Sequence, residues 1–233
     1  MVRASDANPD EVRRVNQQLE ERHYEFRSNC NDGEGDASAC HSWGEWLAVV
    51  DKNYKDAAAM YALNCDKNNY PASCFNLGRL KLAGKGVEMN DTDAIDLFEK
   101  SCKGGHAQGC HHLGFMFCKG LGRDKNILKG VEAFKEACER EDANSCNKVA
   151  SMYLSGAMSA ESRNPIKRDA VMAKTYLEKA CDANFAPACH NLAVMFKKGD
   201  VGVEQSDAKY EEYRKKTNDL IAQAGGMSSV KAS

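Results

Sequence analysis

The chain has 233 residues, of which 42% are hydrophobic, 8% aromatic and 28% charged, and its formal net charge is −2. This length allows one or two globular domains with a substantial core. The near-neutral charge differs from that of nucleic-acid-binding domains, which need a basic surface, so no nucleic-acid partner is expected. No apolar run approaches the roughly 20 residues of a membrane-spanning helix, and no transmembrane segment is expected. The eleven cysteines are too many for an ordinary reduced cytosolic enzyme and need an explanation.

Residues 1–35 are expected to form an N-terminal helix that packs on the first of the repeats described below. Asn8 is suited to cap a helix, Pro9 fits the first helical position, and Asp10 favours the positive end of the helix dipole. The polar helix that follows runs to about Arg27. Because the start of the chain has no apolar stretch and contains early acidic residues, neither a secretory signal nor a mitochondrial presequence is expected.

Five segments of the chain begin with cysteine and repeat one helical pattern. They start at Cys40, Cys74, Cys110, Cys146 and Cys189, which are 34, 36, 36 and 43 residues apart. A large apolar residue comes three positions after each cysteine, Gly or Ala comes four after, and mostly large apolar residues come six and seven after. These offsets describe one face of an α-helix. The small residue would let a second helix approach closely, and a Gly ten positions after four of the cysteines is suited to cap the helix end.

A second helix in each repeat ends in an aromatic residue or Leu four positions before another cysteine. These pairs are Tyr61 and Cys65, Phe98 and Cys102, Phe134 and Cys138, and Leu177 and Cys181, and the N-terminal helix has Phe26 and Cys30. We therefore predict an all-α protein, a right-handed α-solenoid of five disulfide-stapled helix-turn-helix repeats with an extra N-terminal helix.

The repeats are expected to occupy residues 36–222, divided as 36–70, 71–106, 107–142, 143–185 and 186–222. A flexible tail is expected at 223–233. The fourth repeat is longer than the others, and its extra residues, around Ala157 to Pro165, are expected in the loop between its two helices.

Ten of the eleven cysteines fall into pairs, each at the junction between a second helix and the next first helix. The predicted disulfides are Cys30–Cys40, Cys65–Cys74, Cys102–Cys110, Cys138–Cys146 and Cys181–Cys189. Across a short helical hairpin, the two Cα atoms can come within the roughly 4.4–6.8 Å that a disulfide requires. In the last repeat, after which no repeat follows, Thr217 occupies the cysteine position. This favours bridging over the alternative, in which the cysteines are buried reduced thiols.

Cys118 lies outside the pairs and is expected to be a partly buried free thiol, with a redox or metal-binding role as the alternative. No C-x-x-C motif occurs, which argues against a thioredoxin-like catalyst. The histidines close to the leading cysteines, His41, His111, His112 and His190, are of a type that ligates copper or haem. However, they stand at first-turn positions where polar residues are common, and oxidised cysteines cannot bind a metal. No cofactor is therefore expected, and haem or copper binding stays open as the alternative.

Several motifs recur at matching places in the repeats. Phe75-Asn-Leu-Gly78 is followed by Gly84-Lys-Gly86, and Leu113-Gly114 is followed by Gly120-Leu-Gly122. On these motifs, residues 36–220 resemble the Sel-one-like repeat family. The junction cysteines resemble those of its cysteine-rich branch, which contains secreted bacterial proteins once described as β-lactamase-like and a mitochondrial intermembrane-space protein that assists cytochrome c oxidase assembly. Length, N-terminal helix and repeat number are similar to those of the mitochondrial protein.

This resemblance implies a non-catalytic scaffold of the mitochondrial intermembrane space that supports respiratory-chain assembly, chiefly of cytochrome c oxidase. Protein partners in that pathway and the import and oxidation machinery of the compartment are implied, and we expect a monomer. A thiol–disulfide redox protein or a haem- or copper-handling protein of the same pathway is the alternative. No enzyme activity is expected, because the one Ser-x-x-Lys of interest, Ser228 to Lys231, has neither Ser-Asp-Asn nor Lys-Thr-Gly beside it.

Solenoids usually bind partners along one row of helices, and the positions two and five residues after each leading cysteine lie opposite the apolar face. The candidate partner-binding residues at these positions are Asn76, Arg79, His112, Phe115, Lys148 and Asn191. An ordinary solvated helix face is the alternative interpretation of the same pattern.

Overall fold

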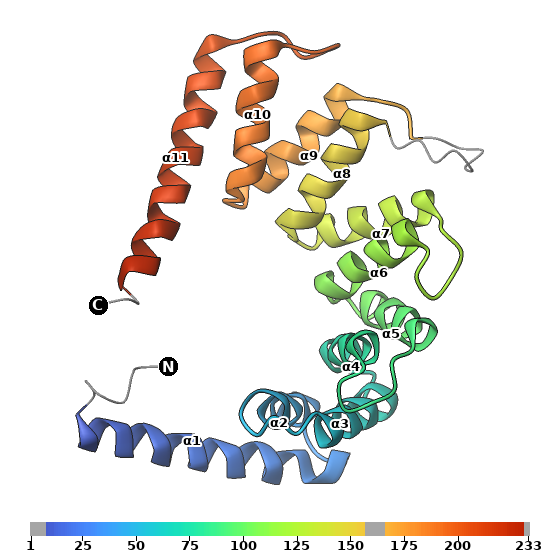
Figure 1. Ribbon diagram of the computed structural model, residues 1–233, viewed down its shortest axis with the longest axis vertical. Coiled ribbons are helices and arrows are strands. Elements are labelled where there is room, and N and C mark those ends of the chain that lie inside the picture. The colour runs from blue at the N-terminus through green and yellow to red at the C-terminus, as the bar shows by residue number, and fades with distance from the viewer. Residues whose placement is uncertain (1–7, 157–165, 231–233) are drawn as a thin grey trace. The chain divides into compact units, whose positions relative to one another are not determined.

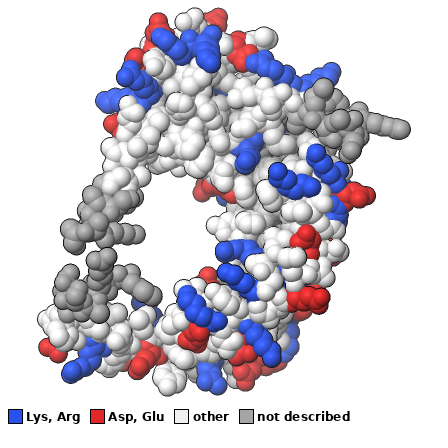
Figure 2. Space-filling model, viewed as in Figure 1, with Lys and Arg blue, Asp and Glu red and all other residues white. Residues whose placement is uncertain are grey.

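The computed structural model describes residues 8–156 and 166–230, which form eleven α-helices and one short 3₁₀-helix (Figure 1). The chain divides into two compact units, residues 1–104 and 105–233, and each is considered by itself. In the described part of the chain, no helix combines the length and the apolar character needed to cross a membrane. Acidic and basic side chains are interspersed over the face shown in Figure 2, in line with the net charge of −2.

Unit 1 contains the N-terminal helix and two helix pairs. Its helices are α1 (Pro9–Cys30), α2 (Ala37–Val49), α3 (Tyr54–Lys67), α4 (Pro71–Ala83) and α5 (Asp91–Lys103), with a 3₁₀ turn at Asn31–Gly33. As predicted, the Asn8 side chain caps α1 and accepts a hydrogen bond from the amide of Asp10 at 3.1 Å. The helix runs to Cys30, three residues beyond the predicted end at Arg27, and places that cysteine beside α2.

Unit 2 contains three helix pairs. Its helices are α6 (Ala107–Lys119), α7 (Ile127–Glu139), α8 (Ala143–Ser155), α9 (Ala170–Asp182), α10 (Ala186–Lys198) and α11 (Asp207–Val230). Together with the pairs of unit 1, they confirm the predicted α-solenoid of helix-turn-helix repeats. The predicted insertion at 157–165 lies outside the described residues.

The structure differs from the sequence prediction at the C-terminus. A tail was expected from residue 223, whereas α11 continues to Val230. Ala222, Gln223 and Ala224 have high helix propensity and carry the helix past the end of the predicted repeat, and it continues through Gly225 and Gly226 although glycine is a poor helix former.

Four first helices end at the predicted glycine. Gly84 and Gly120 have φ angles of 60° and 73° and stand in the left-handed conformation that closes a helix. Their amides donate to the carbonyl oxygens of Leu80 and Met116. The chain can therefore leave the first helix sharply and return as the second.

Within a repeat, the aromatic side chain of the second helix packs on the small residue of the first. A Cβ atom built on Gly44, Gly78 or Gly114 would lie 2.6, 2.9 or 2.9 Å from a ring carbon of Tyr61, Phe98 or Phe134, respectively. In the last repeat Ala193 takes the place of glycine, and Tyr213 stacks on Phe196 with ring centroids 5.7 Å apart. The predicted close approach of the two helices at the fourth position is therefore confirmed.

We expect Gly114→Ala to destabilise the protein. The added Cβ would lie 2.9 Å from the carbonyl oxygen of Gly130 and 2.9 Å from Phe134, so α6 and α7 must separate. Overpacking of this kind costs about 1–3 kcal/mol in the free energy of unfolding, which urea denaturation measures. Gly225→Ala is the control, because nothing lies within 4 Å of its Cβ position, and it should leave stability unchanged or raise it. Equal stability of Gly114→Ala and the wild type would show that the contact is not tight.

Candidate functional site

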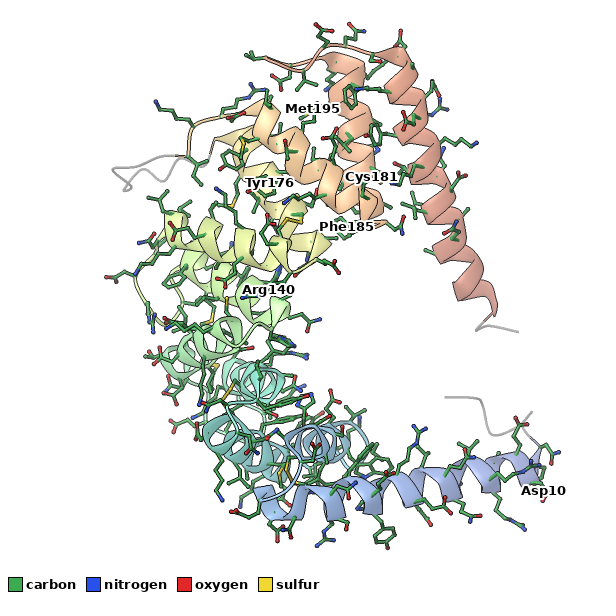
Figure 3. All side chains as sticks on the ribbon, turned by 180° about the vertical axis from the view of Figure 1, so that it is seen from behind. Asp10, Arg140, Tyr176, Cys181, Phe185 and Met195 are labelled. Atoms are coloured by element: carbon green, nitrogen blue, oxygen red, sulfur yellow. A yellow bond between two sulfur atoms is a disulfide. The ribbon has the colours of Figure 1, made fainter. Side chains whose placement is uncertain are left out.

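Disulfides hold the junctions between successive helix pairs within each unit. The Cα–Cα distances are 4.5 Å for Cys30–Cys40, 4.9 Å for Cys65–Cys74, 4.7 Å for Cys138–Cys146 and 4.8 Å for Cys181–Cys189. Cys181 lies at the end of α9, where the chain turns into α10 (Figure 3). None of these eight cysteines is more than 4% exposed. The bridges therefore lie in the core and fasten each second helix to the next first helix.

Cys102 and Cys110, which end α5 and begin α6 on the two sides of the division between units, are both disulfide-bonded as well. Among the described cysteines, Cys118 is the one free thiol. Oxidised cysteines offer no thiolate to a metal, so in this state the junction sulfurs cannot act as ligands.

The cysteine position is also buried in the last repeat, where it holds Thr217. This side chain is 7% exposed, and its hydroxyl donates to the carbonyl oxygen of Tyr213 at 2.8 Å. This buried position thus accepts a residue that cannot form a disulfide. Packing alone therefore does not require cysteine at this place in the repeat.

Cys118 lies on α6, and its sulfur faces Gly130 of α7 so closely that a side chain at Gly130 would collide with it. Burial raises the pKa of the Cys118 thiol, although Lys125, Lys119 and Lys148 act in the opposite direction. A raised pKa leaves little thiolate near neutral pH, and thiolate is the reactive form. The surroundings of Cys118 therefore favour a packing role.

Two of the candidate histidines connect first helices of successive repeats. His41 Nδ1 on α2 lies 3.0 Å from Ser73 Oγ on α4, and His111 Nδ1 on α6 lies 2.7 Å from Ser145 Oγ on α8. Both serines are fully buried and directly precede the leading cysteine of their repeat. The same hydrogen bond is thus built in both units.

The surroundings of His41 and His111 favour the neutral form of the imidazole. Burial lowers the pKa of His41 and of His111, and the carboxylates of Glu45 and Asp142 oppose this effect only in part. The pattern that identifies them is visible in the sequence, because histidine after one leading cysteine goes with serine before the next. Metal binding was the alternative role predicted for these side chains, and the pairing with serine was not predicted.

A further hydrogen bond links α8 to α10. Asn191 Nδ2 donates to Asn147 Oδ1 at 3.1 Å. Together with the bond between His111 and Ser145, it shows that α6, α8 and α10 lie in one row. The first helices of unit 2 therefore form a continuous surface, cross-linked by polar side chains at its buried edge.

The structure brings four of the six predicted partner-binding residues together in this row. His112 is half-buried and 3.0 Å from the carbonyl oxygen of Gln108, Phe115 is 44% exposed, and Lys148 is exposed on α8. Lys119 Nζ lies 5.9 Å from the centre of the Phe115 ring, within reach of a cation–π interaction. Asn191 on α10 completes the four.

The other two predicted residues belong to α4 in unit 1. Burial raises the pKa of the Tyr61 hydroxyl, and the half-buried side chain of Asn76 acts to lower it. Arg79 is exposed, and its guanidinium carbon lies 5.7 Å from the centre of the Phe75 ring. Asn76 is therefore less accessible to a partner than Arg79 is.

A model of the Sel1 repeat matches residues 71–106, 107–142, 143–185 and 186–209. The chain belongs to the Sel1 repeat family. The first helix pair, α2 and α3, precedes the matched segments and has the same junction disulfides and the same contact between glycine and aromatic ring.

Relatives in this family include proteins named cytochrome c oxidase assembly factor 7. The protein of Xenopus tropicalis is 32% identical over 167 residues, which cover 70% of this chain and 55% of the relative. Assembly factor 7A of Xenopus laevis is 30% identical and covers 78% of this chain and 62% of the relative. The Danio rerio protein is 30% identical over 200 residues and covers 85% of this chain and 70% of the relative. The chain thus spans little more than half the length of the two Xenopus relatives.

Solved structures agree on the fold. A Sel1 repeat protein from Oxalobacter formigenes has a TM-score of 0.74 at 18% identity, covering 91% of this chain and 85% of that chain. A protective antigen of uropathogenic Escherichia coli with an SLR fold has a TM-score of 0.67 at 19% identity and covers 81% of this chain and 39% of that chain. At this level of identity the likeness concerns the fold alone.

Removal of one junction disulfide should lower stability. The Cys138–Cys146 bridge closes a loop with a sequence separation of 8, and the loop-entropy relation gives about 2.5 kcal/mol for such a loop. We expect Cys138→Ser with Cys146→Ser to lose about 2–3 kcal/mol in urea denaturation without reductant. Cys118→Ala is the matched control and should change stability by less than about 1 kcal/mol, because it breaks no bridge. A double variant as stable as the control would contradict a stabilising role of the bridge.

The neutral histidines should make stability depend on pH. Their folded pKa values lie below the ordinary value of 6.5, so the unfolded chain takes up protons first as the pH falls. The stabilisation is complete above about pH 6.5 and is lost as the pH falls below that value. In urea denaturation between about pH 7 and pH 5, the variant His41→Gln with His111→Gln should show a shallower decline than the wild type.

His190→Gln is the control for this experiment, because His190 occupies the equivalent repeat position and is exposed. Its pH profile should match that of the wild type. Parallel profiles for the wild type and the double variant would show that His41 and His111 do not couple protonation to unfolding.

Proposed function

We propose that this protein is a non-catalytic scaffold that supports assembly of the mitochondrial respiratory chain, chiefly of cytochrome c oxidase. The observation that carries the proposal is the match to cytochrome c oxidase assembly factor 7 of Danio rerio, 30% identical over 85% of this chain and 70% of the relative. The match extends over 200 residues, which is several times the length of one repeat, and this supports a shared role rather than a shared building block.

The placement of polar side chains supports a scaffold rather than an enzyme. His41 and His111 are committed to buried serines in the neighbouring repeat, and Asn191 is committed to Asn147. These groups hold first helices in register. The exposed residues of the row, including Phe115 and Lys148, are then available for contact with a partner protein.

The intermembrane space is the compartment that we propose. Buried disulfides at successive junctions form and persist where thiols are oxidised. Oxidation on arrival would close the repeats and retain the folded protein, so the import and oxidation machinery would be its first partners. We propose that it then acts as a monomer that contacts its client through the row of first helices.

Thiol–disulfide exchange, the alternative function that the sequence left open, is less well supported. The junction cysteines are at most 4% exposed, and an attacking thiolate has to reach a sulfur atom. Burial also raises the pKa of Cys118, the free thiol.

Deletion of the gene tests the proposal. We expect the activity and the assembled amount of cytochrome c oxidase in isolated mitochondria to fall to a fraction of normal, while succinate dehydrogenase and citrate synthase stay unchanged. Re-expression of the wild type or of Cys118→Ala should restore the oxidase, because the free thiol has no part in the proposed role. Normal oxidase in the deletion strain, or failure of Cys118→Ala to restore it while the protein accumulates normally, would contradict the proposal.

A further inference from the structure

In unit 2, the acidic side chains of the helices lie on the second helix of each pair and not on the first. The first helices α6, α8 and α10 contain no Asp or Glu, and their sequences carry four lysines, Lys119, Lys148, Lys197 and Lys198. The second helices of the same unit, α7, α9 and α11, contain all of the unit's helical acids. A chain with a net charge of −2 therefore has one row of helices without a negative side chain.

Three of the four lysines lie on the exposed stripe of the row. The positions two, five and nine residues after each leading cysteine share one helix face. They hold His112, Phe115 and Lys119 on α6, Lys148, Ser151 and Ser155 on α8, and Asn191, Val194 and Lys198 on α10. We call these nine residues the basic first-helix face.

Among the described residues, no carboxylate forms an ion pair with a lysine of this face. Lys197, outside the face, forms an ion pair with Asp207 at 2.9 Å. Lys119, Lys148 and Lys198 are all exposed, and in the part of the chain that the structure describes none of them forms an ion pair. Their field reaches neighbouring groups, because Lys119 and Lys148 both act to lower the pKa of Cys118 and Lys148 acts to lower that of His111.

An aromatic side chain stands among these cations. Phe115 is 44% exposed beside Lys119. Aromatic residues, Phe among them, are enriched in protein–protein interfaces relative to the rest of the surface. The face thus offers an apolar anchor inside a positive surface.

We propose that the basic first-helix face binds an acidic segment of a partner protein, whose carboxylates meet Lys119, Lys148 and Lys198 and whose apolar side chain packs on Phe115. This inference rests on the proposed scaffold function and specifies the chemistry of the client. Three lysines spread over three helices suit a peptide segment, whereas nucleic acid would require a denser basic stripe. Since the lysines are exposed, binding will be salt-dependent.

The test uses the full chain and two fluorescein-labelled peptides. In the acidic probe, Asp and Glu alternate with Phe and Leu, and in the basic probe Lys replaces every acid. We expect fluorescence anisotropy to show binding of the acidic probe that weakens between about 50 and 200 mM salt, and no comparable binding of the basic probe. Equal binding of both probes would overturn the proposal, because the apolar residues alone would then suffice.

Charge reversal locates the site. The variant with Lys119→Glu, Lys148→Glu and Lys198→Glu should bind the acidic probe about tenfold more weakly or worse, since three exposed attractions become repulsions. The control with Lys129→Glu, Lys209→Glu and Lys215→Glu makes the same change in net charge with lysines of α7 and α11, and it should bind nearly normally. An equal loss in both variants would overturn the assignment to this face. Phe115→Ala should weaken binding several-fold at every salt concentration.

Two further measurements separate this inference from its alternatives. Flotation with phosphatidylglycerol vesicles should recover little protein. If the protein floats with the vesicles but does not bind the acidic probe, the assignment of a protein partner is overturned.

In the deletion strain, re-expressed charge-reversed protein should fail to restore cytochrome c oxidase although it accumulates. Full restoration would overturn the inference and leave the proposed scaffold function unaffected. Normal cytochrome c oxidase in the deletion strain would refute the proposed function. The peptide-binding assay would then still test the basic first-helix face independently.

Discussion

The covalent link at each junction within the two units is the constraint on which the arrangement of repeats depends. A disulfide between the last turn of a second helix and the first turn of the next helix holds their Cα atoms 4.5–4.9 Å apart. Repeats of a solenoid contact only their neighbours, so a loose junction would let successive first helices lose their alignment. With the junction closed, His41 reaches Ser73 and His111 reaches Ser145. The polar cross-links of the first-helix row therefore rely on the bridges.

Inside each repeat the constraint is steric. Glycine or alanine on the first helix leaves room for an aromatic ring or leucine of the second, and a Cβ on Gly78 would lie 2.9 Å from Phe98. One face of each first helix thus packs on the second helix of its own repeat, and one edge contacts the next repeat. The residues on the remaining face of the first helix are not constrained by packing, so they can be of types that bind a partner. That is where unit 2 has lysines and Phe115 and no acids.

Much of the fold and part of the candidate site could be predicted from sequence. Helix offsets and cysteine positions predicted eleven helices and the pairing of Cys138 with Cys146, since both follow from contacts between residues close in the chain. The same reasoning placed Phe115 and Lys148 on an exposed face, because helix periodicity alone assigns them there. It did not show that Asn76 at an equivalent offset is half-buried, because helix periodicity does not tell which neighbouring element covers a position.

The sequence by itself determined the repeat, the helix faces, the glycine caps and which cysteines face one another, because each of these depends on local spacing. Only the tertiary structure showed that His41 and His111 are hydrogen-bond partners of serines, since His111 and Ser145 are 34 residues apart and meet only when two repeats stack. It also showed that Cys118 packs against Gly130 of α7, and that Lys119, Lys148 and Lys198 are exposed on one row of helices and form no ion pair with any described residue. These properties depend on which helices become adjacent, and helix adjacency is decided by packing across repeats.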